Sequence, residues 1–298
     1  MLVSLGFLVG VAPSIPLQLL VIAGGGSGAK SRSTGVTYTG GGGAGGFFEA
    51  TTGNYFFTFG QTYNLVVGAG AAGVQGENPG NTGSNSTLQF HITAGDIGAK
   101  TTKTVYGGGA STLNTGGNGG SGGGGSSRNS TPAYAGGSVI TAGEGNIGGA
   151  GNTNSARKAG AGGGGANAAG GDGVSASGGT GGAGGNGKTS AIKSITYAGG
   201  GGGSAEGVQG AGGSGGGTAG TISSSDDANV AANTGSASGG KTNGAVGAKT
   251  GNGGSGIAAI KYSDIYPALT VTPSGSASVV VSGGFRTYTF TASATIGV

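Results

Sequence analysis

Residues 182–189 (GAGGNGKT) carry the sharpest chemical signal in this 298-residue sequence. They fit the phosphate-binding pattern G-x-x-x-x-G-K-[ST], in which backbone amides hold phosphates, lysine reaches the terminal phosphate and the hydroxyl holds magnesium. The pattern works only between a buried strand and a helix. Here no apolar strand precedes it, residues 190–197 (SAIKSITY) resemble a strand, and a chain with 82 glycines produces such matches by chance. We therefore expect no nucleotide site.

Other groups that could carry out chemistry are sparse. His91 is the only histidine, and the chain has no cysteine, so a metal site or a histidine-based triad lacks partners. Asp226 and Asp227 could ligate a hard cation such as calcium, but an isolated acidic pair in SSSDDAN is more typical of a solvated loop. We expect no metal, no cofactor and no enzymatic activity.

Binding residues are expected in polar segments between glycine blocks. The candidates are Arg128 and Tyr134 in RNSTPAY, and Arg157 and Lys158 in NTNSARK; residues 221–230 form a third such segment. Loops held by a rigid scaffold are common recognition sites. These cations and this ring could stack on or hydrogen-bond a polar glycan. For each segment a plain solvated linker is the alternative.

The composition excludes an ordinary globular core. Glycine accounts for 82 residues, and hydrophobic residues make up only 34% of the chain. Charged residues are 7% and the net charge is +4, whereas many disordered chains are highly charged, so an ordered structure is favoured. The few basic residues are spread along the chain, so we expect no nucleic-acid partner.

The apolar start, residues 1–12 (MLVSLGFLVGVA), resembles the core of a signal peptide but lacks a basic region before it. It is too short to cross a bilayer, so no membrane insertion is expected.

Glycine blocks alternate with short polar segments between residues 24 and 256. Because glycine disfavours helices and offers no side chains for cross-strand pairing, neither element suits these blocks. We expect extended helices of the polyproline II type, with about three residues per turn, whose amides bond to neighbouring chains. The main blocks are 40–46, 116–125, 160–165, 178–187 and 199–203.

Apolar runs outside the blocks are rich in β-branched and aromatic residues and predict strands. Residues 55–67 in particular suggest a hairpin with a short turn. We expect these strands to form a small β platform. The fold class is thus mainly β with little or no α-helix, a platform plus a bundle of polyglycine II-like helices. The predicted strands are 17–23, 55–59, 62–67, 88–93, 257–262, 279–282 and 285–291.

Five motifs occur in a defined order along the chain. They are LLVIAGGG (19–26), GQTYNLVVGAGAAG (60–73), TVYGGGAS (104–111), SITYAGGGGG (194–203) and GGSGIAAIKY (253–262). In this order they resemble the glycine-rich domain of bacteriophage virion proteins, including tail-fibre adhesins with packed polyglycine helices. The resemblance covers residues 17–262. Residues 1–16 form an N-terminal apolar segment and 263–298 a C-terminal β segment.

The resemblance implies a virion structural protein, a tail-fibre or appendage component on the virion surface that aids host attachment. Its partners would be other virion proteins and a host surface glycan or outer-membrane receptor, and a homo-oligomer such as a trimer is left open. The family's modules start with a strand like residues 288–298, so that segment would open a further module. The alternative is a non-viral extracellular glycine-rich structural or ice-binding protein.

Overall fold

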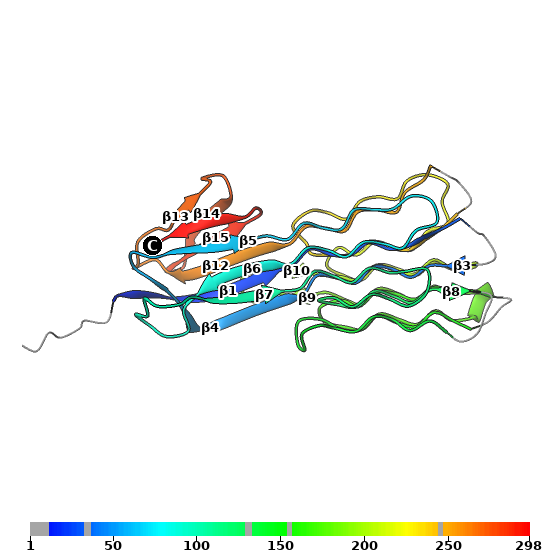
Figure 1. The fold of residues 1–298 in the computed structure, drawn as a ribbon, viewed down its shortest axis with the longest axis horizontal. Helices are drawn as coiled ribbons and strands as arrows, with labels where there is room; N and C mark the ends of the chain where they lie inside the picture. The colour runs from blue at the N-terminus through cyan, green and yellow to red at the C-terminus, as the bar shows by residue number, and fades with distance from the viewer. Residues whose placement is uncertain (1–11, 33–36, 129–132, 154–156, 244–246) are drawn as a thin grey trace, which may run out of the picture.

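The computed structural model describes residues 12–32, 37–128, 133–153, 157–243 and 247–298. The molecule is elongated, with β-sheets at one end and glycine-rich segments that run from them to the opposite end (Figure 1). Among the described residues the one helical element is a three-residue 3-10 turn, Ala176–Gly178. The expectation of a mainly β chain is confirmed.

The first sheet of the platform has five strands in the order β14-β15-β12-β1-β4. Along its central strand β1, alternate residues such as Ile15, Leu17 and Leu19 face a common buried cluster. Strand β1 pairs antiparallel with both neighbours. The strands are β1 (Ser14–Ile22), β4 (Phe47–Thr58), β12 (Ile257–Ser263), β14 (Ala277–Ser282) and β15 (Phe285–Phe290).

The second five-stranded sheet has the order β13-β16-β5-β6-β7. Tyr63, Leu65 and Leu88 of this sheet belong to the same buried cluster as β1, so the two sheets share one apolar core. This core is where most of the chain's large apolar side chains are buried. The strands are β5 (Thr62–Val66), β6 (Ser86–Phe90), β7 (Thr101–Val105), β13 (Thr270–Thr272) and β16 (Ala294–Gly297).

The hairpin predicted over residues 55–67 is wrong. Strand β4 pairs with β1 in the first sheet, whereas β5 pairs with β16 and β6 in the second. The turn at Gly60, whose φ is 77°, instead carries the chain from one sheet to the other. The rings of Phe57 and Tyr63 stack between the sheets with centroids 4.1 Å apart. Burial of these rings outweighs the local preference for a hairpin.

Segments at both ends of the described chain contribute to the platform. Residues 14–16 lie in β1, and strands β13 to β16, all within residues 263–298, complete both sheets. The segment that resembles a module's opening strand, 288–298, pairs here with β12 and β5. The platform is therefore built from strands before, between and after the glycine blocks.

In the glycine-rich part, the backbone of residues 41–46 shows a repeat of three. Its six amides donate hydrogen bonds of 2.8–3.0 Å in turn to three neighbouring segments. Acceptors of residues 41 and 44 lie in 161–164, those of 42 and 45 in 235–238, and those of 43 and 46 in 106–109. Residues three apart in sequence thus face the same neighbour.

The carbonyls of residues 41–46 accept hydrogen bonds from three further segments, which are not the ones that accept from the amides of these residues. Amides in residues 23–26 and 121–124, together with that of Gly201, donate to them. Residues 160–165 repeat the donor pattern, with acceptors in 201–204, 122–125 and 168–171. Central glycine segments are therefore hydrogen-bonded to neighbours on every side.

Apart from the methyl groups of Ala44 and Ala161, these segments carry no side chains, because the neighbouring backbones leave no room for them. A Cβ atom at Gly163 would overlap the carbonyl oxygen of Gly42, and one at Gly41 would overlap that of Gly201. Gly275, in a turn of the platform, has no atom within 4 Å of such a position. Glycine is thus required for packing among these hydrogen-bonded glycine segments, which we call the bundle, but not at Gly275.

We expect Gly163→Ala to destabilise the fold strongly, because the new methyl group must displace a buried backbone. Overpacking of this kind costs about 1–3 kcal/mol or more. Gly275→Ala is the matched control, with a change of less than about 1 kcal/mol. Thermal and denaturant unfolding of both variants measure the difference. Equal stabilities would show that the segments are not closely packed.

Buried tyrosines predict a loss of stability at alkaline pH. Burial raises the pKa of Tyr63, Tyr197 and Tyr262 above the ordinary value of 10. Above pH 10 the unfolded chain therefore releases these protons more readily than the folded one, and stability falls as pH rises. Melting temperatures between pH 8 and 12 should decline above about pH 10. Tyr197→Phe should make that decline shallower; an unchanged slope would contradict the assignment.

Candidate functional site

Four two-residue strands lie where the glycine blocks end, away from the platform (Figure 1). Strands β2 (Lys30–Ser31) and β11 (Lys241–Thr242) pair in parallel, and β3 (Thr37–Tyr38) and β8 (Ser127–Arg128) pair antiparallel. The Thr242 hydroxyl donates to the Thr37 carbonyl at 3.2 Å and links the two pairs. We call these strands, together with residues 133–135, 150–153, 157–158, 172–175 and 221–230, the tip.

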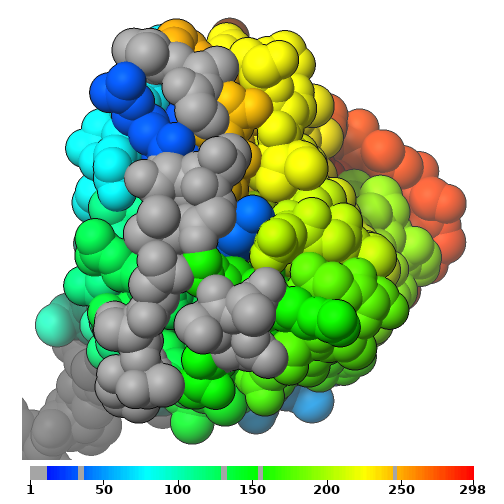
Figure 2. Space-filling model, turned by 90° about the vertical axis from the view of Figure 1, so that its right-hand side faces the viewer, coloured from blue at the N-terminus to red at the C-terminus, as the bar shows by residue number. Residues whose placement is uncertain are grey.

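Side chains reappear at the tip because close packing of bare backbones ends there. Segments from distant parts of the sequence meet at this end, from blue near the N-terminus through green to yellow (Figure 2). Any ligand that contacts this end of the molecule therefore meets side chains supplied by several separate segments.

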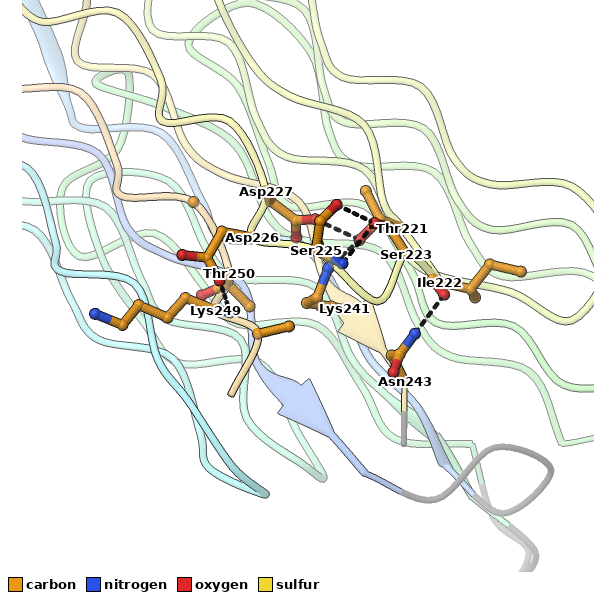
Figure 3. Close-up of polar contacts among 12 residues, drawn as sticks. Thr221, Ile222, Ser223, Ser225, Asp226, Asp227, Lys241, Asn243, Lys249 and Thr250 are labelled. Atoms are coloured by element: carbon orange, nitrogen blue, oxygen red, sulfur yellow. Dashed lines mark hydrogen bonds and ion pairs between the residues drawn. The ribbon is translucent and has the colours of Figure 1, made fainter. Parts of the chain in front are cut away.

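A buried ion pair joins strand β11 to the segment 221–230. Lys241 Nζ lies 2.7 Å from Asp227 Oδ1, and the side chains are 0% and 9% exposed (Figure 3). The Thr221 hydroxyl donates to the same carboxylate oxygen at 2.8 Å. The neighbouring Asp226 is exposed and accepts a hydrogen bond from the Lys249 amide at 2.9 Å. The acidic pair thus divides into one buried and one exposed carboxylate.

Lys30 lies beside this pair, opposite Lys241 in the register of β2 and β11. It is fully buried, and its Nζ donates to the Ala248 carbonyl at 2.5 Å. Burial lowers the pKa of Lys30 and the nearby Lys241 ammonium lowers it further, while the Asp227 carboxylate opposes both effects. One buried carboxylate therefore faces two buried lysines.

The structure brings three of the four candidate binding residues close to one another. Ser127 precedes Arg128 in the sequence, and its hydroxyl donates a hydrogen bond to Asn152 Oδ1 at 2.7 Å. The Asn152 side-chain Nδ2 in turn donates to the Arg157 carbonyl at 2.6 Å, so Asn152 links the two arginine segments. The Gly151 amide donates to the Tyr134 carbonyl at 3.0 Å. Arg128 and Arg157 are exposed and Tyr134 is partly exposed.

Lys158 is different from the other three candidates. It is only 5% exposed, so its side chain is not part of the accessible surface. Its carbonyl accepts from the Glu206 amide at 3.2 Å, which ties it to the bundle. Its neighbour Arg157 is the exposed cation of this segment.

Sequence reasoning missed Asp172, and it proposed the segment NTNSARK without singling out its first residue, Asn152. Both line a shallow depression together with Thr153, Gly173 and Ser175. Asp172 Oδ1 accepts a hydrogen bond from the Ala150 amide at 2.7 Å. A single acid inside the run GGDG is the only sequence signal that could have drawn attention to Asp172.

The phosphate-binding pattern at 182–189 does not have the required geometry. It ends in β9 (Lys188–Thr189), which pairs with β10 (Thr196–Tyr197), and no helix follows. The Lys188 ammonium lies over the Phe47 ring at 5.2 Å. The amides that would hold phosphate already donate to carbonyls of other segments, namely those of Gly182, Gly184, Gly185 and Gly187.

The strand predicted over 190–197 is correct only at its end, in β10. Glu49 accounts for the difference, because its carboxylate accepts hydrogen bonds from the Ser190 hydroxyl and the Ile192 amide and so holds a turn.

His91 lies in the platform core and not at the tip. It is 1% exposed, packs edge-to-face on Tyr63, and its Nδ1 is 3.6 Å from Asp96 Oδ2. Across the described residues, no group of three His, Cys, Asp or Glu side chains could hold a metal ion. In the same ranges no helix is long and apolar enough to span a bilayer.

Comparison with protein families identifies the glycine-rich part. The family described as a glycine-rich domain matches residues 12–263, which include all five ordered motifs. A search of curated proteins finds no match. The chain belongs to the glycine-rich domain family.

We expect Asp227→Asn to destabilise the tip, because it leaves the buried Lys241 ammonium without a counter-charge. Breaking one side of a buried ion pair costs about 3–5 kcal/mol. Asp226→Asn is the control: that carboxylate is exposed, the amide oxygen can still accept from Lys249, and the change should stay below about 1 kcal/mol. Thermal unfolding, with hydrogen exchange at residues 221–230, measures both. Equal effects would contradict the assignment.

Proposed function

We propose that this member of the glycine-rich domain family is a structural protein of a bacteriophage particle, a tail-fibre or appendage component with no enzymatic role. The proposal is supported by the ordered motifs and by the separation of the tip from the platform. Proteins whose role is attachment need a contact surface held away from the point where they are anchored. The platform would face other virion proteins, and the tip would face the host.

We infer that the glycine blocks are polyglycine II-like helices packed side by side. A helix of three residues per turn directs every third amide to the same neighbour, as the acceptors of residues 41–46 and 160–165 do. Such helices approach closely only where side chains are absent, and a Cβ at Gly41 or Gly163 would overlap a neighbouring backbone.

This packing would make the bundle a rigid spacer. Each central segment is fixed by hydrogen bonds from several directions, so bending one requires breaking bonds to several neighbours at once. At about 3.1 Å per residue, a seven-residue block such as 40–46 spans about 22 Å. The tip would thus be held at a fixed distance from the platform.

The tip is the surface that we propose binds a host glycan or an outer-membrane receptor. Arg128, Tyr134 and Arg157 offer two guanidinium groups and one ring from segments that hydrogen-bond to one another. Guanidinium groups donate several hydrogen bonds in one plane, and aromatic faces stack on sugar rings, so both fit a hydroxyl-rich ligand. Lys158, being buried, would support the loop and not touch the ligand.

Binding of purified protein to whole cells across a panel of bacterial strains tests this role. We expect strain-specific binding that falls at least about tenfold when Arg128, Tyr134 and Arg157 are all replaced by alanine, since loss of hot-spot residues costs about 2 kcal/mol or more.

A platform variant with Lys100, Lys261 and Phe285 replaced by alanine likewise removes two cations and one aromatic ring, and it should bind normally. Failure of the unmodified protein on every strain would contradict host attachment, and equal binding by both triple variants would contradict the tip as the contact surface.

A further inference from the structure

Strand β14 is the outermost strand of the first sheet, and its two faces are both accessible. It pairs on one side with β15, and the sheet order places no strand on its other side. Val279, Val280 and Val281 are 50%, 60% and 51% exposed. Because successive side chains of a strand point to opposite faces, these valines expose apolar surface on both faces of the sheet edge.

The remaining edges of the two five-stranded sheets carry features that prevent further pairing. Strand β4 has Glu49 and a register shift against β1, β7 carries Lys103, and β13 is three residues long and followed by Pro273. Charges, bulges, short strands and proline are the usual protections of edges. Strand β14 has none of these, because its register with β15 is continuous over six pairs and its sequence ASVVVS is uncharged.

The backbone of β14 is oriented for pairing at this edge. The two-residue turn Gly283-Gly284, with φ of 59° and 79°, makes Ser282 and Phe285 the hydrogen-bonded pair that closes the hairpin. Because antiparallel pairs alternate, Val280 also points its amide and carbonyl toward β15. Val279 and Val281 therefore point theirs to the open side.

The sequence of this edge is symmetric about Val280, reading SVVVS in both directions. In an antiparallel pair of two such strands related by a twofold axis at Val280, Val279 of each copy lies opposite Val281 of the other. Both of these residues have outward backbone groups, so each such pair exchanges two hydrogen bonds. Val280 then meets its own counterpart, and serine meets serine at each end.

We propose that β14 pairs antiparallel with β14 of a second copy of this chain, joining the two first sheets across a twofold axis. The symmetry of the edge, the alternation of its backbone groups and its lack of protection all point to the same partner and register. A single strand pair buries little area, so the dimer forms with rising protein concentration and does not persist at high dilution. The pairing is independent of the role of the tip.

Cysteine cross-linking of the full chain tests the register, because the natural sequence has no cysteine. In the proposed dimer the two Val280 Cα atoms form a non-hydrogen-bonded pair about 4.5 Å apart, within disulfide range. Val280→Cys under mild oxidation should give mainly a disulfide-linked dimer. Val66→Cys, at an exposed valine (44%) of the interior strand β5, should stay monomeric.

Sedimentation of the cysteine-free protein provides the second measurement. The unmodified chain should show a concentration-dependent monomer–dimer equilibrium that Val280→Lys abolishes and Val66→Lys preserves, with both variants retaining the parent melting temperature. A monomer at all concentrations, a trimer, or equal cross-linking of both cysteine variants would overturn the proposal.

Discussion

Every buried backbone amide needs a partner, and in this chain the partner of most glycine amides is another glycine-rich segment. The bundle depends on this requirement. A hydrophobic core stabilises ordinary domains by removing apolar side chains from water, but residues 41–46 and 160–165 have almost no side chains to bury. Their six consecutive amides find acceptors in three directions instead. Glycine is needed because any Cβ at positions such as Gly163 would displace the acceptor that gives the segment its stability.

The same constraint explains why the two ends of the molecule differ. In the platform, aromatic and branched residues such as Phe57, Tyr63 and Leu65 build a shared core between two sheets. At the tip, the polar side chains at the ends of the glycine blocks hydrogen-bond to one another. The buried carboxylate of Asp227, for example, pairs with the ammonium group of Lys241. The polar network there holds loops in place, while the exposed arginines beside it remain accessible.

Much of the fold could be predicted because the sequence contains two independent signals, the apolar runs and the glycine blocks. Runs rich in valine, isoleucine and aromatic residues predicted strands, and β12, β14 and β15 lie within a residue or two of the predicted ranges. Pairing partners could not be predicted, since residues 55–67 resemble a hairpin locally, whereas β4 pairs with β1 in one sheet and β5 pairs with β16 and β6 in the other. The tip was harder to predict, because Asn152 and Asp172 line one depression only where the Ala150 amide hydrogen-bonds to Asp172, and because nothing in the sequence marks Lys158 as buried.

Amide hydrogen exchange at residues 41–46 tests most directly whether hydrogen bonds between glycine segments hold the bundle together. These amides should exchange only with global unfolding, as slowly as those of Leu20 and Val21 in the buried strand β1. Exchange as fast as at the open turn residue Gly275 would show that the glycine segments are not hydrogen-bonded to one another in solution, and would contradict the account.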